Sequence, residues 1–174
     1  MTSPAPHILL ATTPDHLAAA GRLLGDYAAS LGWDPTDSRL AHEIAELPGP
    51  YAPPSGSLML AYVGDEPAGV LGLQPVPELC RIAGAGAERA GELKRLFVRP
   101  EFRRHGVGQA LMERAEAEAL ARGYDSLVLT TSPEMMPLAQ HLYESLGYVE
   151  SAPYRDDMPY PHIRWMRKEL ARPA

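Results

Sequence analysis

The chain has 174 residues, of which 45% are hydrophobic and 22% charged, with a formal net charge of -6 at pH 7. This length suits one domain with a core large enough to fold unaided, and the composition excludes a disordered or fibrous protein. The acidic balance argues against nucleic acid as the main partner, because phosphate binding needs a basic face. It suits a cationic substrate such as a protonated amine, and it equally suits a role in solubility alone.

Cysteine and histidine usage narrows the chemistry further. Cys80 is the single cysteine, which excludes an internal disulfide framework, and we expect it to be a buried or idle thiol. The histidines show no metal-ligand spacing, so we expect no metal cofactor. The N-terminus lacks a basic segment followed by an apolar one, and no apolar run is long enough to span a bilayer. We therefore expect a cytoplasmic protein without a membrane partner.

The first half of the chain predicts one strand, two helices and a hairpin. Thr13 has the chemistry of a helix N-cap with Pro14 at the first helical position, and Gly32 is a suitable C-cap. Gly64 begins a Gly-Asp-Glu-Pro segment typical of a hairpin turn. The expected elements are a strand at residues 7–12, helices at 13–32 and 38–47, and strands at 58–63 and 68–74.

The second half predicts an alternation of strands and helices after a Gly- and Ala-rich loop at residues 76–91. In the clearest helix, 106–122, the apolar residues Val107, Leu111, Ala115 and Ala119 repeat every four positions. Ser132 is the expected cap of the next helix, which Gly147 ends. Its expected buried stripe comprises Met135, Leu138, Ala139, Leu142 and Leu146. Strands are expected at 92–98, 127–129, 148–152 and 162–168.

This order of elements predicts a mixed α/β fold in which helices pack on a central sheet. We find no internal repeat, and no linker that would split the chain. Residues 1–174 are therefore expected to form a single domain.

The segment Arg103-Arg104-His105-Gly106-Val107-Gly108 lies between an expected strand and an expected helix. Glycines there let backbone N–H groups approach a ligand closely. The first N–H groups of a helix lack intrahelical partners, and the helix dipole adds partial positive charge, so this position suits phosphate. The two arginines and His105 add charge beside it.

Two common phosphate-binding motifs are excluded at this turn. A dinucleotide fingerprint needs a third glycine where the chain has Leu111. A P-loop needs Gly-Lys-Ser/Thr, whereas Gly108 is followed by Gln109 and Ala110. By itself the turn predicts phosphate near a helix N-terminus, and a chance arrangement of arginines is the alternative.

The segment from Glu92 to Gly108 resembles the cofactor-binding segment of the GNAT superfamily of N-acetyltransferases. Arg103, Gly106 and Gly108 match the family's pattern of Arg or Gln, two residues, Gly, one residue, Gly or Ala. A second segment, Leu142-Tyr143-Glu144-Ser145-Leu146-Gly147-Tyr148, is similar to the family's leucine-tyrosine helix end followed by a glycine and an aromatic residue. The resemblance implies the GNAT fold, a mostly antiparallel central sheet with flanking helices.

The resemblance also implies acetyl-CoA as co-substrate and gives residues for it. Leu96, Phe97 and Val98 would run along the pantetheine arm, and a backbone N–H there would polarise the acetyl carbonyl. Arg103 would assist the turn from Arg104 to Gln109, which would hold the pyrophosphate. The cofactor-binding residues are thus expected to be Leu96, Phe97, Val98, Arg103, Arg104, His105, Gly106, Val107, Gly108 and Gln109. The strand at 127–131 would splay away from residues 96–98 and open the reaction slot.

Two catalytic residues follow from the same resemblance. Tyr143 is similar to the general acid that would protonate the departing thiolate, with an ordinary core tyrosine as the alternative. Glu92 is the candidate base, directly or through water. The alternative for Glu92 is a solvated strand end that pairs with Lys94 or Arg95. The family often has an Asn near the start of the last long helix, where this chain has Glu134, Met135 and Met136.

The acceptor is the least defined part of this prediction. We expect a primary amine of a small molecule or peptide, with a non-catalytic acyl-CoA-binding or sensing domain as the alternative, and a homodimer remains open. An acceptor pocket rich in aromatics and carboxylates could hold an ammonium group, although core packing or solvation explains the same residues equally well. The candidates are Tyr27, Trp33, His42, Glu43 and Tyr51, with Tyr154, Arg155, Asp156 and Asp157 in a late loop.

Overall fold

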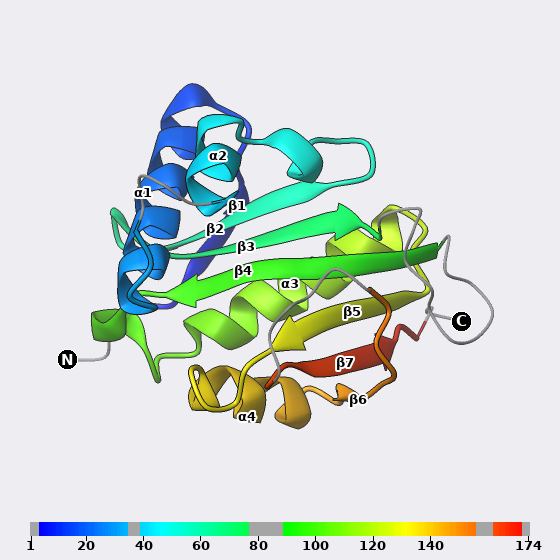
Figure 1. The fold of residues 1–174 in the computed structure, drawn as a ribbon. Helices are drawn as coiled ribbons and strands as arrows, with labels where there is room; N and C mark the ends of the chain where they lie inside the picture. The colour runs from blue at the N-terminus through cyan, green and yellow to red at the C-terminus, as the bar shows by residue number, and fades with distance from the viewer. Residues whose placement is uncertain (1–3, 35–38, 77–88, 156–161, 172–174) are drawn as a thin grey trace.

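The computed structural model describes residues 4–34, 39–76, 89–155 and 162–171 and contains one seven-stranded sheet flanked by helices (Figure 1). The strand order is β1-β2-β3-β4-β5-β7-β6. Only β4 and β5 are parallel, and every other neighbouring pair is antiparallel. In chain order the elements are β1 (His7–Leu10), α1 (Pro14–Ser30), α2 (Arg39–Ala45), β2 (Ser57–Val63), β3 (Glu66–Pro75), β4 (Ala90–Val98), α3 (Val107–Ala121), β5 (Ser126–Thr131), α4 (Pro137–Ser145), β6 (Val149–Glu150) and β7 (Arg164–Glu169).

The helices cover both faces of the sheet (Figure 1). Strand β2 shows how: Leu58 and Leu60 pack with α1 and α2, whereas Met59 and Ala61 pack with α3. Successive side chains of a strand point to opposite faces, so a sheet covered on both sides has apolar residues at every position. The helix α4 packs on the α3 side, through Tyr143. No helix in the described ranges is long and apolar enough to cross a membrane.

The predicted helix signals are confirmed for α1 and α3. The Thr13 hydroxyl accepts a hydrogen bond from the backbone N–H of His16 at 3.2 Å, as an N-cap does. Gly32 follows α1 with a φ of 69°, and Gly123 follows α3 with a φ of 84°. The apolar stripe predicted for α3 is buried throughout, which fixes α3 against β2 and β3.

The prediction for α4 was wrong at its start and in part of its stripe. The helix begins at Pro137, and Ser132 instead opens a turn in which its carbonyl accepts from Met136 at 2.8 Å. Proline at the first helical position disfavours helical backbone in the residue before it, so a helix from Ser132 could not pass through Pro137. Met135 and Leu138 are 52% and 55% exposed, whereas Tyr143 is buried.

The other expected elements lie within a few residues of the observed ones. Strand β4 begins at Ala90, two residues before its predicted start, and β6 is limited to two residues. Cys80, Asp156, Asp157 and most of the predicted loop at 76–91 lie outside the described residues.

Candidate active site

A cavity of about 550 Å³ lies where the C-terminal end of β4 meets the start of α3. Its other walls come from the end of α1 and from the turn and first residues of α4. The lining residues are Tyr27, Ser30, Leu31, Leu96, Phe97, Val98, Arg103, Arg104, Gly106, Val107, Gly108, Gln109, Met135, Met136, Pro137, Leu138, Ala139 and Leu142. The cavity therefore joins the expected pantetheine strand to the expected phosphate turn. His105, which was predicted with them, is exposed and is not among the described residues that line the cavity.

The two parallel strands part beside this cavity, as expected. Strands β4 and β5 pair only from Ala90 to Glu92 on β4 and from Ser126 to Val128 on β5. Beyond Glu92 the β5-facing edge of β4 is unpaired, and Leu96 to Val98 line the cavity from that free stretch. Backbone N–H and C=O groups without a strand partner are available to a ligand laid along the edge.

A β-bulge lies at the start of that free stretch. Lys94 faces Gly72 and Phe97 faces Val70, so Arg95 and Leu96 together oppose one residue of β3. Arg95 has a φ of 65°, a left-handed backbone that is uncommon for a residue with a side chain. Bulges of this kind bend the strand and leave one residue without its ladder hydrogen bonds. Strain at such a position indicates a functional site.

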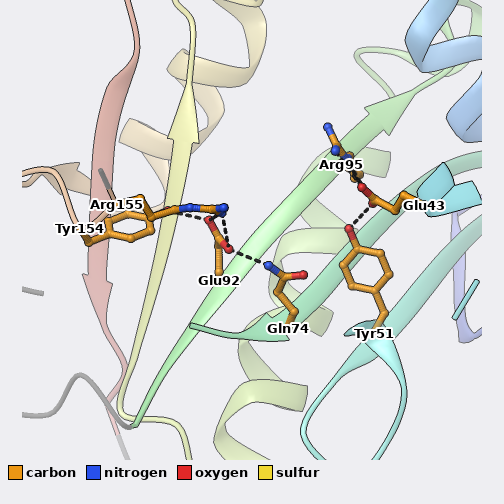
Figure 2. Close-up of polar contacts among 7 residues, drawn as sticks. All are labelled: Glu43, Tyr51, Gln74, Glu92, Arg95, Tyr154 and Arg155. Atoms are coloured by element: carbon orange, nitrogen blue, oxygen red, sulfur yellow. Dashed lines mark hydrogen bonds and ion pairs between the residues drawn. The ribbon is translucent and has the colours of Figure 1, made fainter. Parts of the chain in front are cut away.

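An ion pair holds the strained residue in place. The Arg95 guanidinium donates to both carboxylate oxygens of Glu43 on α2, through Nη2 at 2.8 Å and Nε at 3.1 Å. The Tyr51 hydroxyl donates to the same carboxylate (Figure 2). Burial raises the pKa of Glu43, but the hydrogen bonds and charge of Arg95 outweigh this and hold it below its usual value. We call Glu43, Tyr51 and Arg95 the Glu43 network.

The turn expected to hold phosphate has a backbone that suits anion binding. Arg104 and Gly106 both adopt left-handed φ angles, of 64° and 75°. Left-handed residues beside right-handed ones form concavities of backbone N–H groups that bind anions. No side chain caps α3, whose first turn also carries no acidic residue, so its N–H groups remain open. Arg103 is tied to the end of β4, where its Nε donates to the Val98 carbonyl at 3.0 Å.

Gly106 and Gly108 are required for different structural reasons. Gly106 needs its positive φ, and a Cβ there would meet nothing within 4 Å. A Cβ on Gly108 would lie 3.1 Å from Cδ2 of Leu142. Gly108 therefore lets α3 approach α4 closely, a packing role that the sequence did not indicate.

Tyr143 lies in the core, next to Leu142, which lines the cavity. Its side chain is buried, and its ring centroid is 6.1 Å from that of Tyr148. Burial, and to a lesser extent the neighbouring Tyr27, raise the pKa of Tyr143 above its ordinary value of 10.0. Tyr27 itself lines the cavity, and Leu142, next to Tyr143, does so too. The phenol therefore stays protonated, and Tyr143 is not among the described residues that line the cavity.

Glu92 sits in a buried polar network rather than at a solvated strand end. It is 1% exposed and accepts hydrogen bonds from Gln74 at 2.7 Å, Tyr154 at 3.1 Å and Arg155 at 3.1 Å (Figure 2). The alternative that it pairs with Lys94 or Arg95 was wrong, because Arg155 forms its ion pair and Arg95 pairs with Glu43. We call these four residues, Glu92, Gln74, Tyr154 and Arg155, the Glu92 network.

The structure brings together only some of the predicted acceptor residues. Tyr27 and Trp33 meet edge to face at 6.0 Å, and Glu43 and Tyr51 share a hydrogen bond. His42 instead faces Glu46 at 3.4 Å on the exposed side of α2. Gln74 and the pairing of Arg95 with Glu43 were not predicted, since partners so distant in sequence leave no local signal. Within the described ranges, no group of three His, Cys, Asp or Glu residues could hold a metal ion.

The Glu43 network yields a stability prediction. Both side chains of the pair are 13–14% exposed, so Glu43→Gln leaves a largely buried guanidinium without its counter-charge. We expect this change to lower the free energy of unfolding by about 2–3 kcal/mol at pH 7. Because the pKa of Glu43 is depressed on folding, its contribution is present above the ordinary value of 4.5 and is lost as the pH falls through the folded value.

Urea unfolding of both proteins from pH 7 downwards tests this, with Glu46→Gln as the control. Glu46 is 64% exposed in its side chain, and its loss should cost less than about 0.5 kcal/mol. The difference between wild type and Glu43→Gln should shrink below pH 4.5. A difference that is absent at pH 7, or that grows in acid, would contradict the assigned role of the ion pair.

Comparison with known proteins agrees with this geometry. The family model described as the Acetyltransferase (GNAT) family matches residues 23–148. An uncharacterized N-acetyltransferase of Schizosaccharomyces pombe is 31% identical over 91% of each chain. An acetyltransferase of the GNAT family from Staphylococcus aureus has the same fold, with a TM-score of 0.74 at 17% identity over 96% of this chain and all of the other. A Salmonella typhimurium protein solved with acetyl-CoA superposes with a TM-score of 0.69 at 16% identity over 97% and 96% of the two chains.

A parallel strand pair that parts beside an open helix N-terminus thus defines an acyl-CoA N-acyltransferase fold. The chain belongs to the GNAT acetyltransferase family. It is an acetyl-CoA-dependent acyltransferase.

Proposed function

We propose that this enzyme transfers the acetyl group of acetyl-CoA directly to a primary amine of a small molecule or peptide. The observation that carries the proposal is the continuous cavity from the turn at Arg104 to the unpaired edge of β4. One end offers backbone N–H groups and arginines to a pyrophosphate, and the other offers a strand edge to the amide-containing pantetheine arm. The Salmonella protein solved with acetyl-CoA supports this assignment.

In the proposed reaction the amine nitrogen attacks the thioester carbonyl carbon. The C–N bond forms, the C–S bond breaks, and CoA leaves as a thiolate. An N–H group freed by the bulge at Arg95 and Leu96 would stabilise the carbonyl oxygen as it gains charge. Such donors act without reorganising, because the Glu43 pair already holds the bulge in position.

Two protons must move during this reaction. The amine's proton would pass to Glu92 through water, since both carboxylate oxygens already accept hydrogen bonds. The thiolate would take a proton from Tyr143, whose raised pKa keeps it protonated at neutral pH. Leaving Tyr143 as a phenolate in the core is costly, so it would regain a proton from solvent before the next turnover.

The first experiment measures thiol release from acetyl-CoA across a panel of primary amines. We expect at least one amine to raise the rate well above hydrolysis alone, with the acetylated amine as product. Thermal stabilisation by CoA does not substitute for this assay, because binding alone produces it. If no amine in a broad panel accelerates thiol release, the acceptor class proposed here is wrong.

Replacing the candidate base gives a pH-dependent prediction. We expect Glu92→Gln to lower kcat about 100-fold near pH 6.5 but less than about tenfold near pH 9.5, where solvent already deprotonates the amine. The control is Gln74→Met, which removes one hydrogen bond to the same carboxylate and keeps its charge. An equal loss at both pH values, or the same profile in the control, would assign Glu92 a structural role only.

A further inference from the structure

Lys94 is a cation with no counter-charge of its own in the described part of the chain. It lies on β4 two residues beyond Glu92, with no bulge between them, so both side chains point to the same face of the sheet. That face carries both the Glu92 network and the Glu43 network (Figure 2). Lys94 also lies in the stretch of β4 beyond Glu92 that β5 leaves unpaired.

Tyr51 fixes the surroundings of Lys94. Gly72 is the cross-strand neighbour of Lys94, and a Cβ on Gly72 would lie 2.4 Å from the Tyr51 ring. The ring therefore packs over β3 directly beside the Lys94 position. The Lys94 side chain is thus placed between two polar networks and an aromatic wall, and it is partly buried.

The charges around Lys94 are already paired with each other. Its charged neighbours are Arg95, Glu92, Glu43 and Arg155. Arg155 forms an ion pair with Glu92 and Arg95 forms one with Glu43, whereas Lys94 lies within 4.0 Å of no carboxylate in the described residues. Burial, and next the charge of Arg95, lower the pKa of Lys94. Counted over these described residues, the charges leave an excess of one positive charge, and the Lys94 ammonium group that carries it is partly buried.

We propose that Lys94 binds a carboxylate of the acceptor, so that the preferred acceptors are amines that carry a carboxylate, such as amino acids. This inference rests on the proposed amine acetylation and names its substrate class. A carboxylate would supply the missing counter-charge through a charge-assisted hydrogen bond. The same cluster of cations would favour the neutral form of the acceptor's amine, which is the form that attacks.

The test compares each of three amino acids, glycine, β-alanine and 4-aminobutyrate, with its own amide. The two members of each pair differ only in the carboxylate. We expect wild type to favour at least one acid over its amide by about tenfold or more in kcat/KM. Lys94→Met should remove that preference by lowering kcat/KM for the acid about 10- to 100-fold, with the amide changed less than about threefold. Lys94→Arg should keep most of the preference.

These outcomes separate the two proposals. Acetylation of amines without any preference for the acids, or a preference that survives in Lys94→Met, overturns the role of Lys94 and leaves the acetyltransferase activity standing. Absence of transfer to every amine overturns the proposed function first. Activity on the amides serves as the folding control for each variant.

A second measurement does not need turnover. With CoA bound, acetylation of Lys94 by a small reactive ester is followed by mass spectrometry. N-acetyl-4-aminobutyrate, the product of one acceptor, should slow this labelling several-fold, and N-acetyl-4-aminobutyramide should not. If Lys94 is labelled at the same rate in the presence of the acid and of the amide, the inference is overturned, even when no acceptor in the panel is turned over.

Discussion

Gly108→Val is expected to lower CoA affinity at least about 100-fold, which corresponds to the loss of two charge-assisted hydrogen bonds. Gly108 is the second residue of α3, and its backbone lines the cavity beside Arg104 and Gln109. In the proposed binding mode, a branched side chain there would occupy the space in which the pyrophosphate approaches the backbone N–H groups. Isothermal titration with CoA measures the change directly.

A packing effect must be separated from this ligand effect. The Cβ of the new side chain would lie 3.1 Å from Cδ2 of Leu142, so the valine also pushes on α4. Leu142→Ala, alone and combined with Gly108→Val, provides the control because it opens space next to the new side chain, and the single variant measures what this change to the cavity wall does to CoA affinity by itself. We expect the double variant to regain thermal stability without regaining CoA affinity. Unchanged affinity in Gly108→Val, or rescue of binding by Leu142→Ala, would contradict the phosphate assignment.

Tyr143→Phe is expected to lower kcat about 100-fold while changing CoA affinity less than about twofold. The substitution removes one hydroxyl from a buried ring and leaves its packing against Tyr148 intact. Because burial raises the pKa of Tyr143 above 10.0, the phenol stays protonated across the neutral and mildly alkaline range. The wild-type kcat should therefore show no decrease between pH 8 and pH 10 from loss of this proton.

Tyr148→Phe is the matched control for that experiment. Tyr148 is another buried tyrosine of the same core cluster, and burial raises its pKa too. The cavity-lining Tyr27 contributes to the raised pKa of Tyr143 but not to that of Tyr148. We expect Tyr148→Phe to keep kcat within about twofold of wild type. Equal turnover in Tyr143→Phe and wild type would reject the general acid role, and equal losses in both tyrosine variants would indicate a packing effect.

The elements that were predicted best are those whose signal is local. The four-residue repeat of α3, the Thr13 cap of α1 and the apolar run of β5 each lie within one element, and each is present as expected. The error at α4 has a local origin too, since Ser132 and Pro137 give competing helix starts and the proline prevails. Membership in the GNAT family was likewise indicated by two short motifs.

The partners of the charged residues were decided by the tertiary structure. Glu92 pairs with Arg155 across 63 residues, and Glu43 pairs with Arg95 across 52. Neither choice leaves a periodic or neighbouring signal, because any of several arginines and lysines satisfies the same charge requirement. The bulge at Arg95 is similar: it depends on the register of β4 against β3, which the sequence of β4 does not contain.

The sequence by itself therefore determined the order of the elements, the glycine-containing turn between β4 and α3, and the family, because local periodicity and turn chemistry are contained within short segments. Only the tertiary structure decided that β4 and β5 part beyond Glu92 and that Lys94 is left without a counter-charge among the described residues. Both depend on which groups, distant in the sequence, the sheet brings within a few ångströms of one another, and no local pattern in the sequence records that.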